Sequence, residues 1–110
     1  MEKISKELQE KIQHLQILEQ NLQNLLMQKQ AFQFELNETE NALAEVKKTK
    51  EDIFKLVGSI MLKASKEEIE QELSQKKDIL SLRTKSIEKQ ESQIREATEK
   101  LREEVLKKIK

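Results

Sequence analysis

Residues 52–65 read "DIFKLVGSIMLKAS" and differ from the sequence on either side of them. The flanking segments consist mainly of Glu, Lys, Gln and Leu, whereas this stretch is a dense apolar run around Gly58, the only glycine of the chain. A Gly-X pair such as Gly58-Ser59 suits a two-residue type II′ turn between antiparallel strands. We therefore predict a β-hairpin over about residues 53–64.

The turn fixes the register of the hairpin and sorts its side chains onto two faces. With Val57 opposite Ile60, alternation along each strand gives every residue a face. One face carries Ile53, Lys55, Val57, Ile60, Leu62 and Ala64, and the other carries Phe54, Leu56, Met61 and Lys63. An antiparallel sheet with one face in water alternates apolar and polar residues, and this hairpin does not.

A hairpin that is apolar on both faces needs more strands than this chain supplies. Two strands alone are marginally stable, and their outer edges leave backbone groups unpaired. We expect hairpins of other subunits to pair with this one and close an intersubunit β-barrel. The expected oligomerisation residues are Ile53, Phe54, Leu56, Val57, Gly58, Ile60, Met61 and Leu62. The alternative is a kinked helix or loop packed against the chain's own helices.

A seven-residue repeat runs through the first half of the chain. Apolar residues recur at alternating steps of four and three from Ile4 to Val46, and only Lys11, Lys29 and Thr39 interrupt them. A repeat held over about six heptads indicates a left-handed supercoil. We predict one long helix over about residues 3–48.

The second half carries a weaker version of the same repeat. One row consists of Leu73, Leu80, Ile87, Ile94 and Leu101. We expect the companion row at Ile69, Lys76, Arg83, Gln90, Ala97 and Glu104, which makes the seam only half apolar. Ser65 followed by Glu68 has the pattern of a capping box. We predict a helix over about residues 66–110.

Composition supports a mostly α protein. The 110 residues contain no proline, 35% hydrophobic residues and 38% charged residues, as is typical of long helices and coiled coils. Disorder is the competing interpretation, but the net charge is zero and the leucines are periodic. Two helices of similar length joined by a short connection predict an antiparallel two-helix coiled coil, with the β-hairpin at the connection.

Several classes of function are disfavoured. Lys and Arg equal Asp and Glu at 21 each, so no basic field attracts nucleic acid or an anionic membrane. Cysteine is absent, His14 is the sole histidine, and no glycine-rich loop or nucleophile motif occurs. We expect no enzyme activity, no metal and no cofactor. The start "MEKISKELQE" is not a secretory signal, and no apolar run is long enough to span a membrane, so we expect a cytoplasmic protein.

Three segments together resemble a known family. They are "LMQKQAFQFELNETENALAEV" (26–46), "IFKLVGSIMLK" (53–63) and "SIEKQESQ" (86–93), and the hairpin segment is the most specific. The chain resembles the beta-class subunit of prefoldin, of the archaeal type or the related eukaryotic type, over almost its whole length. The resemblance implies a single prefoldin-like domain over residues 1–110. Alpha-class subunits carry a second hairpin, for which this connection has no room.

The resemblance implies an ATP-independent cochaperone. In the family, two alpha-class and four beta-class subunits join their hairpins into a β-barrel platform from which six coiled coils extend. The coiled-coil tips hold non-native proteins and deliver them to a group II chaperonin. The implied partners are therefore alpha-class subunits, further beta-class copies, non-native clients and the chaperonin.

The residues at the two chain ends agree with a client-binding tip. In an antiparallel pair the ends meet, and two helices cannot bury all of their apolar side chains, which leaves an exposed patch. This tip cluster comprises Met1, Ile4, Leu8, Ile12, Leu101, Val105, Leu106 and Ile109. The alternative is that these residues only close the coiled coil. Ile17, Met27 and Phe34 lie outside the seam, and we interpret them as ordinary surface residues rather than as a client-binding lining.

Two other functions compete with a cochaperone subunit. A coiled-coil tether or scaffold would account for the heptads but would leave the two-faced hairpin without a purpose. A trimeric periplasmic holdase with helical tentacles is disfavoured by the missing secretory signal.

Overall fold

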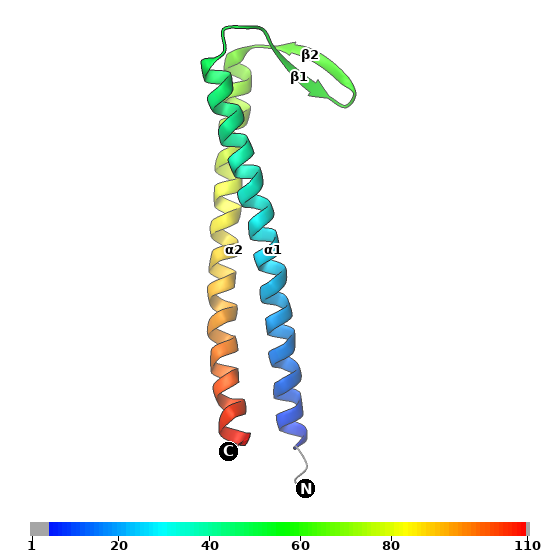
Figure 1. Cartoon of the computed structure of the whole chain (residues 1–110), viewed down its shortest axis with the longest axis vertical. Coiled ribbons are helices and arrows are strands. Elements are labelled where there is room, and N and C mark those ends of the chain that lie inside the picture. The colour runs from blue at the N-terminus through cyan, green and yellow to red at the C-terminus, as the bar shows by residue number, and fades with distance from the viewer. Residues whose placement is uncertain (1–4, 110) are drawn as a thin grey trace. The chain divides into compact units, whose positions relative to one another are not determined.

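The computed structural model describes residues 5–109 as two long helices joined by a β-hairpin (Figure 1). Helix α1 spans Lys6–Lys48, strand β1 spans Ile53–Val57, strand β2 spans Ile60–Ala64, and helix α2 spans Lys66–Ile109. The mostly α fold class, with one hairpin at the helix–helix connection, is confirmed.

Contacts divide the chain into two compact units, which are described separately. The terminal unit contains the chain up to Gln30 and from Lys85 onward, and the hairpin unit contains Ala31–Thr84. In each unit a segment of α1 runs antiparallel to a segment of α2 (Figure 1).

Serine side chains cap the start of both helices. The backbone N–H of Leu8 donates to Ser5 Oγ at 3.1 Å, so α1 begins at Lys6 rather than near residue 3. The N–H of Glu68 donates to Ser65 Oγ, also at 3.1 Å, and α2 begins at Lys66 as predicted. This is the serine half of the predicted capping box, while the Glu68 carboxylate contacts Lys55 of β1.

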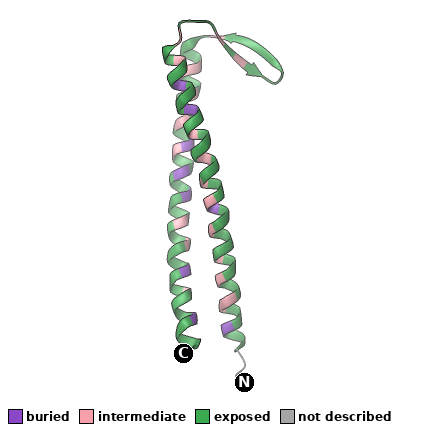
Figure 2. Ribbon diagram, viewed as in Figure 1, coloured by how far each residue is buried: buried purple, intermediate pink, exposed green. Residues whose placement is uncertain are grey.

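The heptad seam of α1 lies where the sequence predicts it. Every described member of the predicted set is buried or half-buried. Leu8 and Leu25 are buried in the terminal unit, and Thr39 and Leu43 are buried in the hairpin unit (Figure 2). Thr39 fits into the seam because its hydroxyl donates to the backbone oxygen of Glu35 at 2.8 Å.

The seam of α2 differs from the prediction in one of its two rows. The row from Leu73 to Leu101 is buried or half-buried, as predicted. The companion row lies one residue later than expected, at Lys77, Thr84, Glu91, Thr98 and Val105. The expected Lys76, Arg83, Gln90, Ala97 and Glu104 are all exposed, and only Ile69 of that row is half-buried.

Hydrogen bonding of its hydroxyl explains how a threonine can occupy the buried row of α2. A buried hydroxyl costs free energy unless it is hydrogen-bonded. Thr84 Oγ1 donates to the backbone oxygen of Leu80 at 2.9 Å, so its methyl group can pack in the seam while the hydroxyl stays bonded. Thr98 is the exception, because its buried Oγ1 has no hydrogen-bond partner.

Charged residues also occupy the seam and its flanks in the terminal unit. Lys29 of α1 pairs with Glu91 of α2 at 3.6 Å, and both side chains are mostly shielded from solvent. Glu19 pairs with Arg102 at 3.4 Å. These oppositely charged contacts join the N-terminal part of α1 to the C-terminal part of α2, and they favour this antiparallel register.

The hairpin has the predicted register at every pair. Val57 pairs with Ile60, and the ladder continues to Ile53 opposite Ala64. Gly58 has φ of 62°, and no non-glycine residue in 5–109 has positive φ. A positive φ at the first turn position only is the requirement of a type II′ turn, which confirms the role predicted for Gly58.

Candidate functional site

The hairpin exposes apolar side chains on both faces. Phe54 and Leu56 on one face are 53% and 70% exposed, and Ile60 on the other is 62% exposed. We call the exposed set the hairpin surface: Phe54, Leu56, Val57, Ile60, Met61 and Leu62. Among the residues that the structure describes, β1 and β2 form a two-stranded sheet with no third strand at either edge. The hairpin therefore offers unpaired backbone groups and uncovered apolar area together, as strand addition requires.

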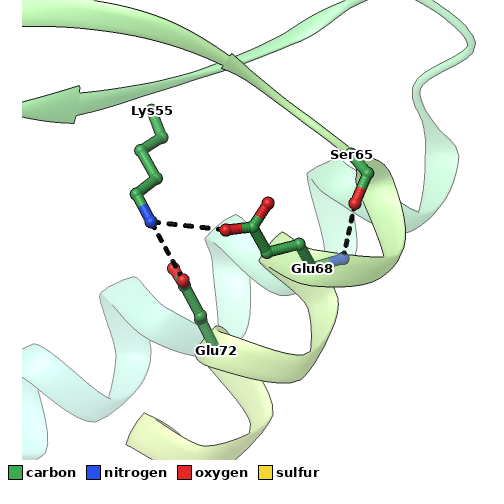
Figure 3. A network of polar contacts seen from close by, with 4 residues as sticks. All are labelled: Lys55, Ser65, Glu68 and Glu72. Atoms are coloured by element: carbon green, nitrogen blue, oxygen red, sulfur yellow. Dashed lines mark hydrogen bonds and ion pairs between the residues drawn. The ribbon is translucent and has the colours of Figure 1, made fainter.

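The base of the hairpin is held against α2 by one lysine. Lys55 Nζ lies 3.1 Å from Glu72 Oε1 and 3.4 Å from Glu68 Oε1 (Figure 3). Glu68 and Glu72 are one helical turn apart, so both carboxylates point to the same side of α2. The hydrogen bond and charge of Glu72, followed by those of Glu68, raise the pKa of Lys55 above its usual range. We call these three residues the Lys55 clamp.

Other polar contacts connect the segments around the hairpin base. Lys66 Nζ donates to the backbone oxygen of Lys47 at 2.9 Å and to that of Thr49 at 3.3 Å. These carbonyl groups lie at the C-terminal end of α1, where cations are favoured. Lys63 on β2 pairs with Asp52 at 3.6 Å, and both side chains are exposed.

The structure places the members of the predicted tip cluster in different environments. Leu8 and Val105 are each 7% exposed and belong to the seam, while Ile12 and Leu101 are half-buried. Leu106 and Ile109 are exposed on the last turns of α2. Met1 and Ile4 lie outside the described residues.

Ion pairs tie the two helix ends together beside these residues. Glu7 lies 2.6 Å from Lys108 and 3.7 Å from Lys11, measured from carboxylate oxygen to ammonium nitrogen. Lys11 also pairs with Glu104 at 3.3 Å. The hydrogen bond and charge of Lys108, followed by the charge of Lys11, lower the pKa of Glu7. The end of the helix pair is therefore charged on its flank and apolar at Leu106 and Ile109.

Exposed apolar residues also occur on the outer sides of both helices. Ile17, Met27 and Phe34 are exposed on α1, as the heptad pattern predicts. Ile79 and Leu82 are exposed on α2, and the sequence analysis did not single them out. Neither residue belongs to the predicted or the observed rows of the α2 seam, so the heptad pattern places both outside it.

The residues that could ligate a metal are dispersed over the described part of the chain. No group of three His, Cys, Asp or Glu residues within 5–109 could hold a metal ion. His14 lies exposed on α1. Over the same range, neither helix combines the length and apolar character needed to cross a membrane.

Comparisons with known proteins agree on one family. The sequence model of the family described as "Prefoldin subunit" matches residues 2–110. A prefoldin subunit beta of Pyrobaculum islandicum is 39% identical over 111 residues, which cover 99% of this chain and 89% of the relative. The prefoldin subunit beta of Pyrococcus furiosus is 35% identical over 107 residues, which cover 96% and 92%.

A solved structure has the same fold. The crystal structure of the prefoldin beta subunit from Thermococcus strain KS-1 matches with a TM-score of 0.88 at 30% sequence identity. The match covers 96% of this chain and 94% of that one.

Proposed function

The chain belongs to the prefoldin family, and on this premise we propose that it is a beta-class subunit of an ATP-independent cochaperone. The complex captures non-native proteins and delivers them to a group II chaperonin. The single observation that carries the proposal is the hairpin surface, which is exposed on both faces in a sheet of only two strands. A protein that acted alone would gain nothing from such a surface and would risk aggregation through it.

The hairpin is the proposed site of assembly. Strands from neighbouring subunits pair with β1 and β2, and the hairpins close into an intersubunit β-barrel. Two alpha-class and four beta-class subunits make the proposed hexamer. Burial of the hairpin surface drives this assembly, since apolar area removed from water contributes about 25 cal/mol per Å².

The tip cluster is the proposed site of client binding. Its seam members, led by Leu8 and Val105, hold the two helix ends together. Leu106 and Ile109 remain free to contact the apolar segments of an unfolded chain. The charged residues around them keep the patch soluble.

Paired substitutions test client binding separately from assembly. Replacing Leu106 and Ile109 by serine should leave the hexamer intact and weaken its ability to suppress aggregation of a denatured client. The matched control is Leu82→Ser, which removes a comparably exposed leucine from α2 in the hairpin unit. Full suppression by the double variant would refute the tip as the client site, and so would an equal loss in the control.

A coiled-coil tether is the second candidate. The heptad seams in both units favour it, but a tether leaves the hairpin surface uncovered. A tether should give the same oligomer with or without an alpha-class subunit, whereas the proposed function requires a mixed complex.

The remaining expectations follow the same proposal. Residues 1–110 act as one prefoldin-like domain, a view supported by the family match over residues 2–110. The work is done by binding, without catalysis, nucleic acid, membrane or cofactor. The cytoplasm stays the predicted compartment.

A further inference from the structure

We propose that Lys55 is a positioning residue for assembly, which fixes the hairpin on α2 through Glu68 and Glu72 so that its strands meet those of the neighbouring subunit. The inference rests on the proposed function and names the device that prepares the hairpin for it. Lys55 is the only charged side chain on its face of the hairpin, among Ile53, Val57, Ile60, Leu62 and Ala64.

The geometry distinguishes Lys55 from the other lysine of the hairpin. Its ammonium group reaches two carboxylates of α2, at 3.1 and 3.4 Å, across 17 and 13 residues of sequence (Figure 3). Its side chain is 33% exposed. Lys63 is 68% exposed and pairs with Asp52, which directly precedes β1. Among the ion pairs of residues 5–109, those of Lys55 alone link a strand to a helix.

The Lys55 clamp restrains the orientation of the hairpin relative to α2. The segment between α1 and β1 covers only residues 49–52, and Ser65 alone separates β2 from α2. Near this base Ile53, Lys55 and Ala64 are half-buried, whereas Val57 and Ile60 beside the turn are exposed. Burial therefore decreases from the base toward the turn, and among the ion pairs of residues 5–109 the clamp is the one that links the hairpin to α2.

Restraint of the hairpin favours assembly because the hairpin then loses less conformational entropy when subunits associate. A surface already held in its bound orientation loses less conformational freedom on association than one that moves. The clamp also supplies two carboxylates to the Lys55 ammonium, so the charge remains paired when neighbouring strands remove water from the hairpin.

Distance measurements in the isolated chain test the positioning role. The chain has no cysteine, so Ser59→Cys at the turn and Gln75→Cys on α2 can carry two spin labels without further changes. Both positions are exposed and lie in the hairpin unit. We expect one narrow distance distribution with Lys55 present and a clearly broader one in Lys55→Gln. The control Lys63→Gln should stay as narrow as the parent.

A charge exchange connects the clamp to assembly. Lys55→Glu should broaden the distribution and weaken association with an alpha-class subunit about three- to tenfold, the scale expected for two partly exposed ion pairs. Adding Glu68→Lys and Glu72→Lys to this variant restores the opposite charges. We expect it to recover both the narrow distribution and most of the affinity. Rescue of this kind separates the clamp from a direct contact between Lys55 and the neighbour.

Each outcome of these experiments either supports or contradicts the positioning role of Lys55. A Lys55→Gln distribution as narrow as the parent would overturn it, as would full affinity in a variant whose distribution is broad. Recovery of the distances without recovery of affinity would also overturn it. If the unsubstituted chain fails to join any alpha-class subunit, the proposed function fails and takes the inference with it. Equal assembly by all variants refutes the inference alone.

Discussion

Leu80 and Leu82 offer a direct test of the helix packing in the hairpin unit. Leu80 is 2% exposed and more deeply buried than any other described residue, whereas Leu82, two positions later on α2, is 67% exposed. Replacing each by alanine removes the same atoms from the same helix and changes helix propensity equally. Only the packing lost differs between the two variants.

The expected cost of Leu80→Ala follows from its burial. Removal of the buried carbons loses about 0.8 kcal/mol per methylene in transfer free energy, and a cavity adds to this. Leucine-to-alanine changes in protein cores cost about 2–5 kcal/mol. A two-helix pair is open on its flanks and can relax, so we expect about 2–3 kcal/mol, at the lower end of that range. Leu82→Ala should remain within about 0.5 kcal/mol of the parent.

Urea unfolding followed by helical circular dichroism measures both variants. The isolated chain should be used at one fixed low concentration, because association makes apparent stability depend on concentration. An unchanged slope with urea would show that both variants unfold from the same state. Equal costs for the two variants, or a larger cost for Leu82→Ala, would refute the placement of the α2 seam.

Three further predictions concern single features. Thr98→Val should raise the free energy of unfolding by about 1 kcal/mol in the same urea assay, because the buried Thr98 hydroxyl has no hydrogen-bond partner. The control Thr84→Val removes a hydrogen-bonded hydroxyl and should not raise the free energy of unfolding. Gly58→Ala should weaken assembly while leaving helical content unchanged. A φ of 62° costs a residue with a side chain about 1–2 kcal/mol, even though no atom lies within 4 Å of the new Cβ. Equal affinity of the variant and the parent in a titration with an alpha-class subunit would contradict this prediction. Lys108 lowers the pKa of Glu7 in the folded chain. The stabilisation from this pair is therefore fully present above the unfolded-state pKa of Glu7 and is lost as pH falls through the lowered folded-state pKa. Glu7→Gln should flatten that part of the profile of stability against pH, and an unchanged profile would contradict the contribution of the pair.

The hairpin and the first helix could be predicted from sequence because local rules determine them. A Gly-X turn fixes the register of the strands on both sides of it, so Gly58 and Ser59 were enough to place every pair. In the first helix both rows of the heptad are mostly apolar, so only one seam is possible.

The second helix lacks that redundancy. Its row from Leu73 to Leu101 permits a companion three or four residues further on, and both candidates are largely polar. Ile69 and Ala97 are apolar and favour the expected row over the row that contains Thr84 and Thr98. The misplaced row also put Val105 outside the seam, although the structure buries it.

The Lys55 clamp could not be predicted from sequence. It joins a strand to a helix, and no periodicity relates a position on one to a position on the other. In the sequence, Glu68 fits the pattern of a capping box, and Glu72 does not differ from other charged residues on a helix surface. Its recognition required the distances in the folded chain.

In the proposed complex, strands of other subunits complete the hairpin. The most direct test is the native mass of the complex formed when this chain is mixed with an alpha-class prefoldin subunit. We expect a hexamer of four copies of this chain and two of the partner, and we expect Leu56→Asp to abolish the hexamer while helical content is retained. A mixture in which the two proteins stay separate, or a hexamer that survives Leu56→Asp, would contradict it.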